Sequence, residues 1–84
     1  MAGISAWRVN DAVAYDLMRE SATVLISSLV RLADRDASGS GQFRSEVADL
    51  RRRLVSVDAY DRAAVTVLTR AIEGRIDELS GASS

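Results

Sequence analysis

The sequence predicts an all-α fold, either a three-helix bundle or a long helix packed against a helical hairpin, that self-associates. Three observations lead to this prediction. Apolar residues recur at helical spacing in three segments, no segment shows sustained alternation of period two, and 48% of the 84 residues are apolar. A chain of this length is expected to form one domain, 1–84, with a small core that gains burial from association with another chain.

The first helix is predicted over about 10–36, because Asn10 is a favourable N-cap residue, although Ser5 is an alternative start. At 3.6 residues per turn its broad apolar face gathers Ala14, Tyr15, Met18, Ala22, Leu25, Ile26, Leu29, Leu32 and Ala33. A second, narrower apolar strip lies outside that face and consists of Val13, Leu17 and Val24. Because the broad face supplies the core, we expect the narrow strip to be covered by something else.

The second helix is predicted over about 42–55 and the third over about 59–80. Each has one apolar face, formed in the second by Phe43, Val47, Leu50 and Leu54 and in the third by Ala64, Val67, Leu68, Ala71, Ile72, Ile76 and Leu79. The break before the second helix contains two Ser-Gly pairs, and Asp58 is the predicted N-cap of the third helix. Residues 81–84 are expected to form a frayed, flexible tail.

The chain contains no His, Cys, Lys or Pro. Most nucleophilic catalysis and metal binding by side chains depends on His, Cys or Lys, so we expect neither an enzyme nor a bound cofactor. All 11 basic residues are Arg, which is typical of a GC-rich bacterial genome because Lys codons are rich in A. The first residues lack the pattern of a secretion signal, so a bacterial cytoplasmic location is expected.

Neither a membrane nor a nucleic acid is an expected partner. The most apolar stretch, Ala22 to Val30, is far shorter than the ~20 residues of a spanning helix. The formal net charge of −1 gives no general attraction to anionic lipid or nucleic acid. The basic cluster Arg51-Arg52-Arg53 spreads over about 200° of a helix, so its members do not face one phosphate backbone together. Only Arg44 and Arg51 share an edge.

The segment from Asp34 to Ser40 resembles the start of an EF-hand calcium loop. The oxygen-bearing residues at its first, third and fifth positions are Asp34, Asp36 and Ser38. A Gly follows at the sixth position, as in that family, whereas the twelfth is Ser45 instead of the usual Glu. The alternative is the end of a helix followed by a Ser/Gly turn, and the absence of a metal site is our main expectation.

The segment Thr69-Arg70-Ala71-Ile72-Glu73-Gly74 resembles the inhibitory motif of antitoxins that silence Fic-type AMP-transferases. In that motif a Ser or Thr, three further residues, a Glu and a Gly or Asn occupy a helix. The resemblance implies that Glu73 pairs with an Arg of a toxin's nucleotide site, with Thr69 and Gly74 completing the motif. The alternative is that Thr69 and Glu73 belong to an ordinary solvated face of the third helix.

The function expected from these observations is a non-catalytic helical protein–protein interaction module, an adaptor or a dimerising accessory protein. Its contact is predicted at Val13, Leu17 and Val24, with Trp7 and Tyr15 as aromatic anchors. The partner is another protein, a second copy of the chain, or both. Two alternatives stay open: a small antitoxin or immunity-type inhibitor of a nucleotide-using toxin, and a degenerate EF-hand-like calcium-responsive helical pair.

Overall fold

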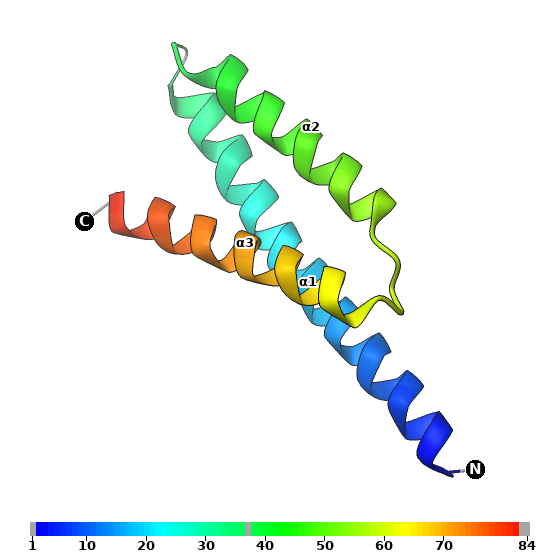
Figure 1. Cartoon of the computed structure of the whole chain (residues 1–84). Helices are drawn as coiled ribbons and strands as arrows, with labels where there is room; N and C mark the ends of the chain where they lie inside the picture. Colours follow the sequence, from blue (N-terminus) through cyan, green and yellow to red (C-terminus); the bar gives the residue numbers. More distant parts are fainter. Residues whose placement is uncertain (1, 37, 83–84) are drawn as a thin grey trace.

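The computed structural model describes the backbone of residues 2–36 and 38–82 and the side chains of residues 10–36 and 38–81. It contains three helices, α1 (Ala2–Arg35), α2 (Ser40–Ser56) and α3 (Arg62–Ala82), and no strand among the described residues. The predicted all-α class is therefore confirmed. The chain runs along α1, returns beside it in α2, and turns again into α3 (Figure 1).

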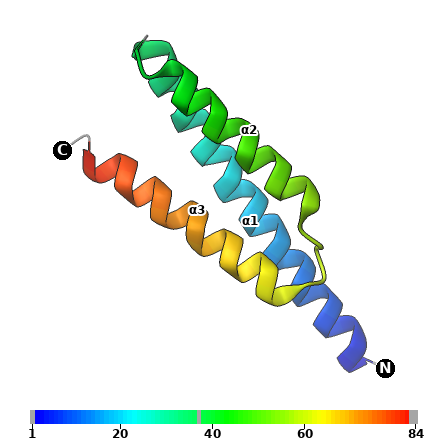
Figure 2. The same ribbon diagram turned by 45° about the horizontal axis from the view of Figure 1, so that its top comes forward.

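α1 is the central element of the arrangement. α2 and α3 both pack against α1, and over the described residues their own backbones do not approach each other. Figure 2 shows α1 between its two neighbours, with α2 and α3 diverging. The result is an elongated molecule of 55 × 26 × 16 Å, in which every interhelical backbone contact in the described part involves α1.

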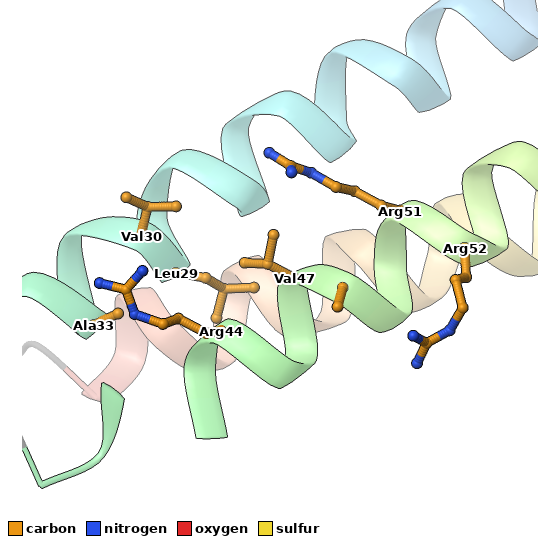
Figure 3. A pocket seen from close by; sticks show the side chains of 8 residues that line it. Leu29, Val30, Ala33, Arg44, Val47, Arg51 and Arg52 are labelled. Carbon is orange, nitrogen blue, oxygen red and sulfur yellow. The ribbon is translucent and has the colours of Figure 1, made fainter. Parts of the chain in front are cut away.

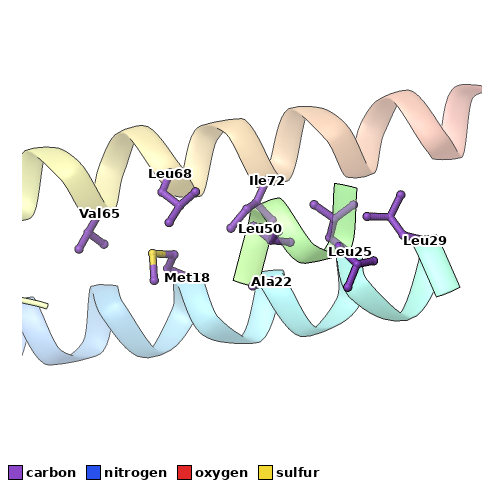
Figure 4. Close-up of a cluster of buried hydrophobic side chains, with 9 residues drawn as sticks. Met18, Ala22, Leu25, Leu29, Leu50, Val65, Leu68 and Ile72 are labelled. Carbon is purple, nitrogen blue, oxygen red and sulfur yellow. The ribbon is translucent and has the colours of Figure 1, made fainter. Parts of the chain in front are cut away.

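The core lies where α1 meets the other two helices. Its largest fully buried side chains are Met18, Leu29, Val65 and Ile72. Figure 4 shows side chains of α1 and α3 meeting in rows, with Leu50 of α2 among them. Burying one such side chain stabilises the fold by about 1.5–3 kcal/mol, so this shared cluster holds all three helices together. The α1 residues of the cluster belong to the broad face that the sequence predicts.

The apolar face of α3 differs from the predicted one, because Val65 joins it whereas Val67 and Ala71 are exposed. Val65 is buried, whereas Val67 is 63% exposed. The buried residues Val65, Leu68 and Ile72 follow one another at spacings of three and four, which places them on one side of the helix. Val67 lies about 140° around the helix from Ile72, so it points away from that side and from the packing against α1.

The helix ends also differ from the predicted ones. α1 begins at Ala2, so Asn10 lies inside the helix and does not cap it. α3 begins at Arg62, and its N-cap is Asp61, whose Oδ1 accepts a hydrogen bond from the Ala64 amide at 3.1 Å. Asp58 instead accepts a hydrogen bond from the Tyr60 amide at 2.9 Å, in the turn before α3.

The C-terminal helix ends later than predicted, just as it begins later. Gly81 and Ala82, which the sequence assigns to a frayed tail, belong to α3, and residues 83–84 lie outside the described residues. Over the described residues, none of the helices combines the length and the hydropathy that crossing a bilayer needs.

The turn between α1 and α2 is organised by Asp36. Its Oδ1 accepts hydrogen bonds from the Ser38 hydroxyl at 2.7 Å, the Ser38 amide at 3.1 Å and the Gly39 amide at 3.2 Å. These hydrogen bonds, the one from the Ser38 hydroxyl first, hold the pKa of the Asp36 carboxyl below its ordinary value. A Cβ on Gly39 would lie 2.9 Å from Asp36 Oδ2, so this tight turn favours the glycine.

Candidate functional site

The outer strip, which we define as Val13, Leu17 and Val24, lies on the side of α1 turned away from the core. Their exposed fractions are 51%, 55% and 53%. The spacings of four and seven residues place the three side chains on one face of the helix. Asp16 and Glu20 lie beside them, both exposed and without a hydrogen bond or ion pair among the described residues. No other part of the described chain covers these three apolar side chains.

Of the two predicted aromatic anchors, the structure describes the side chain of Tyr15 alone. Trp7 belongs to α1, but its side chain lies outside the described residues. Tyr15 is half-buried, packs against the edge of the core and contacts Arg19, whose guanidinium carbon lies 5.9 Å from the ring centroid. Tyr15 lies two positions after Val13 and two before Leu17, which is about 200° around the helix axis from each of them. Tyr15 is therefore not beside the outer strip.

The N-terminal part of α1 projects beyond the rest of the fold. Arg62, the first residue of α3, forms an ion pair with Asp11 through Nη1 and Oδ1 at 2.9 Å. In Figures 1 and 2 the helix continues past this level, toward the N-terminus, without a neighbouring helix. The outer strip therefore begins close to the end of α1 that the other two helices leave uncovered.

A hollow of about 540 Å³ opens between α1 and α2 (Figure 3). Its apolar lining consists of Leu29, Val30 and Ala33 from α1 and Val47 and Ala48 from α2. Three arginines of α2, Arg44, Arg51 and Arg52, complete it. Figure 3 shows Arg44 and Arg51 extending toward α1, while Arg52 points away from it.

A second hollow, of about 390 Å³, lies further along the same two helices. Its apolar lining is Tyr15, Ala22 and Ile26 from α1 and Leu54 and Val55 from α2. Arg19 lines it too, and Arg51 lines both hollows. We call the two together the Arg-rimmed groove. Among the described residues that line it, none is Asp or Glu.

The arginines of the groove differ in how far their charges are balanced. Arg44 contacts Asp34 at 3.7 Å, and both side chains are largely exposed. Arg52 pairs with Asp49 one turn before it on α2. Arg51 has neither a hydrogen bond nor an ion pair within the described part of the chain. Its charge is therefore available to a carboxylate from outside.

The cleft between α2 and α3 is bridged by one residue of each helix. Arg75 donates two hydrogen bonds to Glu46, Nε to Oε2 at 2.7 Å and Nη2 to Oε1 at 2.9 Å, and a third from Nη1 to Glu78 at 3.1 Å. The hydrogen bond with Glu46, the largest influence, raises the pKa of Arg75 above its usual range. Arg75 is thus already paired within the chain, unlike Arg51 of the Arg-rimmed groove.

The residues predicted for an alternative calcium site are used otherwise. Asp34 lies in the last turn of α1 and contacts Arg44. Asp36 and Ser38 hydrogen-bond to each other in the turn. α2 already begins at Ser40, so the twelve-residue loop of an EF-hand is not formed. Within the part of the chain that the structure describes, no three His, Cys, Asp or Glu residues gather closely enough to hold a metal ion.

The residues of the inhibitory-motif resemblance lie on α3. The Thr69 hydroxyl donates to the carbonyl oxygen of Val65 at 2.7 Å, so it serves its own helix. Glu73 and Gly74 are exposed, and a Cβ on Gly74 would meet no atom within 4 Å. Glu73 has no hydrogen bond or ion pair among the described residues. All three residues lie within two turns of α3, with Thr69 and Glu73 one turn apart on the same face.

Sequence reasoning missed the Arg-rimmed groove. A groove requires two helices at a fixed distance, and the apolar periodicity of one helix does not contain that distance. Two residues in the sequence pointed to it, because Val30 and Val55 fall outside the apolar faces assigned to their helices. In the structure both are exposed, Val55 by 88%. The shared edge of Arg44 and Arg51 was another signal, and it is this edge that α2 turns toward α1.

Comparisons with known proteins add no functional assignment: no family model, no curated protein and no solved structure matches this chain.

Proposed function

We propose that this protein is a non-catalytic helical interaction module that associates through the outer strip of α1, in the first place with a second copy of itself. One observation supports this proposal above all. Val13, Leu17 and Val24 lie on one face of the longest helix and are each about half exposed. A chain of this size has a small core, and covering an apolar face with a second chain adds burial that the single chain lacks.

Two further observations favour this surface over the rest of the molecule. The outer strip is carried by a regular helix whose opposite face is packed through Met18 and Leu25, so the backbone that presents the three side chains is held in the unbound state. Rigid presentation lowers the entropy that association costs. The strip also begins near the projecting end of α1, where the other helices do not obstruct an approaching chain.

The inhibitor and calcium alternatives are not part of this proposal. Thr69 is engaged within its own helix, and Asp36 within its own turn. No contact among the described residues favours either alternative over an ordinary surface. A cytoplasmic location and the absence of catalysis belong to the proposal as expectations that follow from the composition.

The test is the mass of the protein in solution, measured by light scattering over a range of concentrations. We expect wild-type protein to exceed the mass of one chain, and Leu17→Asp and Val24→Asp to fall to one chain. The matched control is Val67→Asp, which places the same charge at an exposed valine of α3 and should keep the wild-type mass. Circular dichroism and thermal unfolding should show that all three variants remain folded. Wild-type protein that stays a single chain at high concentration would contradict the proposal.

A further inference from the structure

Two surfaces of this chain are apolar and open: the outer strip on one side of α1, and the Arg-rimmed groove between α1 and α2. Within the described residues neither is covered. They lie on different sides of the same helix, because Val24 of the strip and Ile26 of the groove are about 200° apart around α1. One chain thus cannot close its own groove with its own strip.

We infer that the Arg-rimmed groove of one copy receives the outer strip of a second copy. This inference rests on the proposed function, since it names the surface against which the outer strip packs. The mode of binding is that of an amphipathic helix in a groove, with apolar side chains at spacings of four and seven residues as anchors.

The lengths of the two surfaces agree. Val24 lies eleven positions after Val13, which is about 17 Å along a helix. The groove follows α1 from Tyr15 to Ala33, which is about 27 Å. The two hollows together therefore span the length of the strip, and each offers an exposed apolar contact, Val30 in the first and Val55 in the second.

The charges agree as well. Four arginines and no carboxylate line the groove. Arg44 and Arg52 already contact Asp34 and Asp49 of the same chain, whereas Arg51 has no partner among the described residues and extends toward α1. The strip is flanked by Asp16 and Glu20, which have no partner within the described part of the chain. Docking the strip into the groove brings these carboxylates to Arg51, which lines both hollows and is the arginine of α2 in the groove that has no partner among the described residues. Such complementarity guides association and excludes wrong pairings.

The two symmetric alternatives lack this complementarity. Two strips placed face to face bring Glu20 of both copies to the same contact, because Glu20 continues the line of Val13, Leu17 and Val24 at spacings of three and four. Two grooves placed face to face bring their arginines together. Like charges across a contact are unfavourable, so strip into groove is the pairing that the charges favour.

A contact between two different surfaces of the same chain leaves one strip and one groove free after the first pairing. The assembly therefore grows beyond two chains, into a closed ring or an open series of copies. Raising the ionic strength should weaken it, because salt screens exposed charges.

The experiment mixes two variants that each carry one intact surface. Leu17→Asp disables the strip and keeps the groove, while Arg51→Glu disables the groove and keeps the strip. Both positions are exposed, and Arg70→Glu on α3 is the matched control for the charge reversal. Val24→Asp and Arg44→Glu form a second pair, to be used where circular dichroism shows that a variant of the first pair is unfolded. The mass of each protein alone, and of the equimolar mixture, is measured by light scattering.

We expect each disabled variant alone to have the mass of one chain, and the mixture to give a two-chain species about twice that mass that grows no further. Arg70→Glu should assemble like wild-type protein. If Arg51→Glu alone still associates and only Leu17→Asp fails to associate, the inference is overturned but the proposed function stands. A mixture that stays at the mass of one chain would also overturn the inference. Wild-type protein that does not associate would overturn both.

Discussion

The guanidinium of Arg75 on α3 holds both carboxylate oxygens of Glu46 on α2, at 2.7 and 2.9 Å. The backbones of these two helices do not approach each other over the described residues, so this bidentate pair spans the cleft between them. Each side chain is 31% exposed. Bidentate pairing of this kind has a specific geometry as well as opposite charges, and here it joins α2 to α3 across that cleft.

The first prediction concerns this pair. In a double-mutant cycle with Glu46→Gln and Arg75→Met, we expect a coupling of about 1 kcal/mol in the free energy of unfolding, reduced by added salt. The comparison pair is Asp49 and Arg52, which lies on the surface of α2 with both side chains more than 60% exposed. Its coupling should stay below about 0.5 kcal/mol. Equal couplings for the two pairs, measured by urea unfolding, would contradict our account of the cleft.

The second prediction concerns the core. Ile72 is 1% exposed and packs with residues of α1 and α2, so Ile72→Ala should lower the free energy of unfolding by about 2–5 kcal/mol. Val67→Ala, at a position 63% exposed on the same helix, should change it by no more than about 0.5 kcal/mol. Urea unfolding followed by circular dichroism measures both, and similar losses in the two variants would show that α3 is rotated relative to the structure described here.

The third prediction concerns the start of α3. Because Asp61 Oδ1 caps the Ala64 amide, Asp61→Ala should cost about 1 kcal/mol of stability. Asp58→Ala should cost less, because Asp58 bonds only within the preceding turn. The reverse order in thermal unfolding would favour the earlier helix start that the sequence alone predicts.

The fourth prediction concerns acid stability. The pKa of Asp36 is lowered in the folded protein, so its hydrogen bonds contribute stability above the ordinary aspartate pKa, about 3.9, and lose it as the pH falls through the lowered value. When the pH is lowered from neutral to below about pH 4, the melting temperature should therefore fall less for Asp36→Asn than for wild-type protein. Identical pH profiles for the two proteins would exclude this role of the Asp36 carboxylate. Ser38→Ala, which removes one of the donors, should shift the profile in the same direction.

The sequence by itself determined the helical class and the separation of apolar surfaces on α1. Spacings along one helix decide which side chains share a face, so the buried set of α1 and the exposure of Val13, Leu17 and Val24 follow from the order of residues. The ends of the helices were less determined. Both Asp58 and Asp61 are good caps, and the choice between them depends on where the preceding turn fits.

The tertiary structure decided what depends on the distance between helices. The packing of α2 beside α1 places Arg44 and Arg51 next to apolar side chains of α1. The position of α3 allows Arg75 to bind Glu46 of α2 in addition to Glu78 of its own helix. It also decided that Val65 is buried and Val67 is not. The periodicity of a sequence defines which side of each helix a residue faces. Grooves, ion pairs between helices and the rotation of a helix about its axis depend on how the three helices pack against one another.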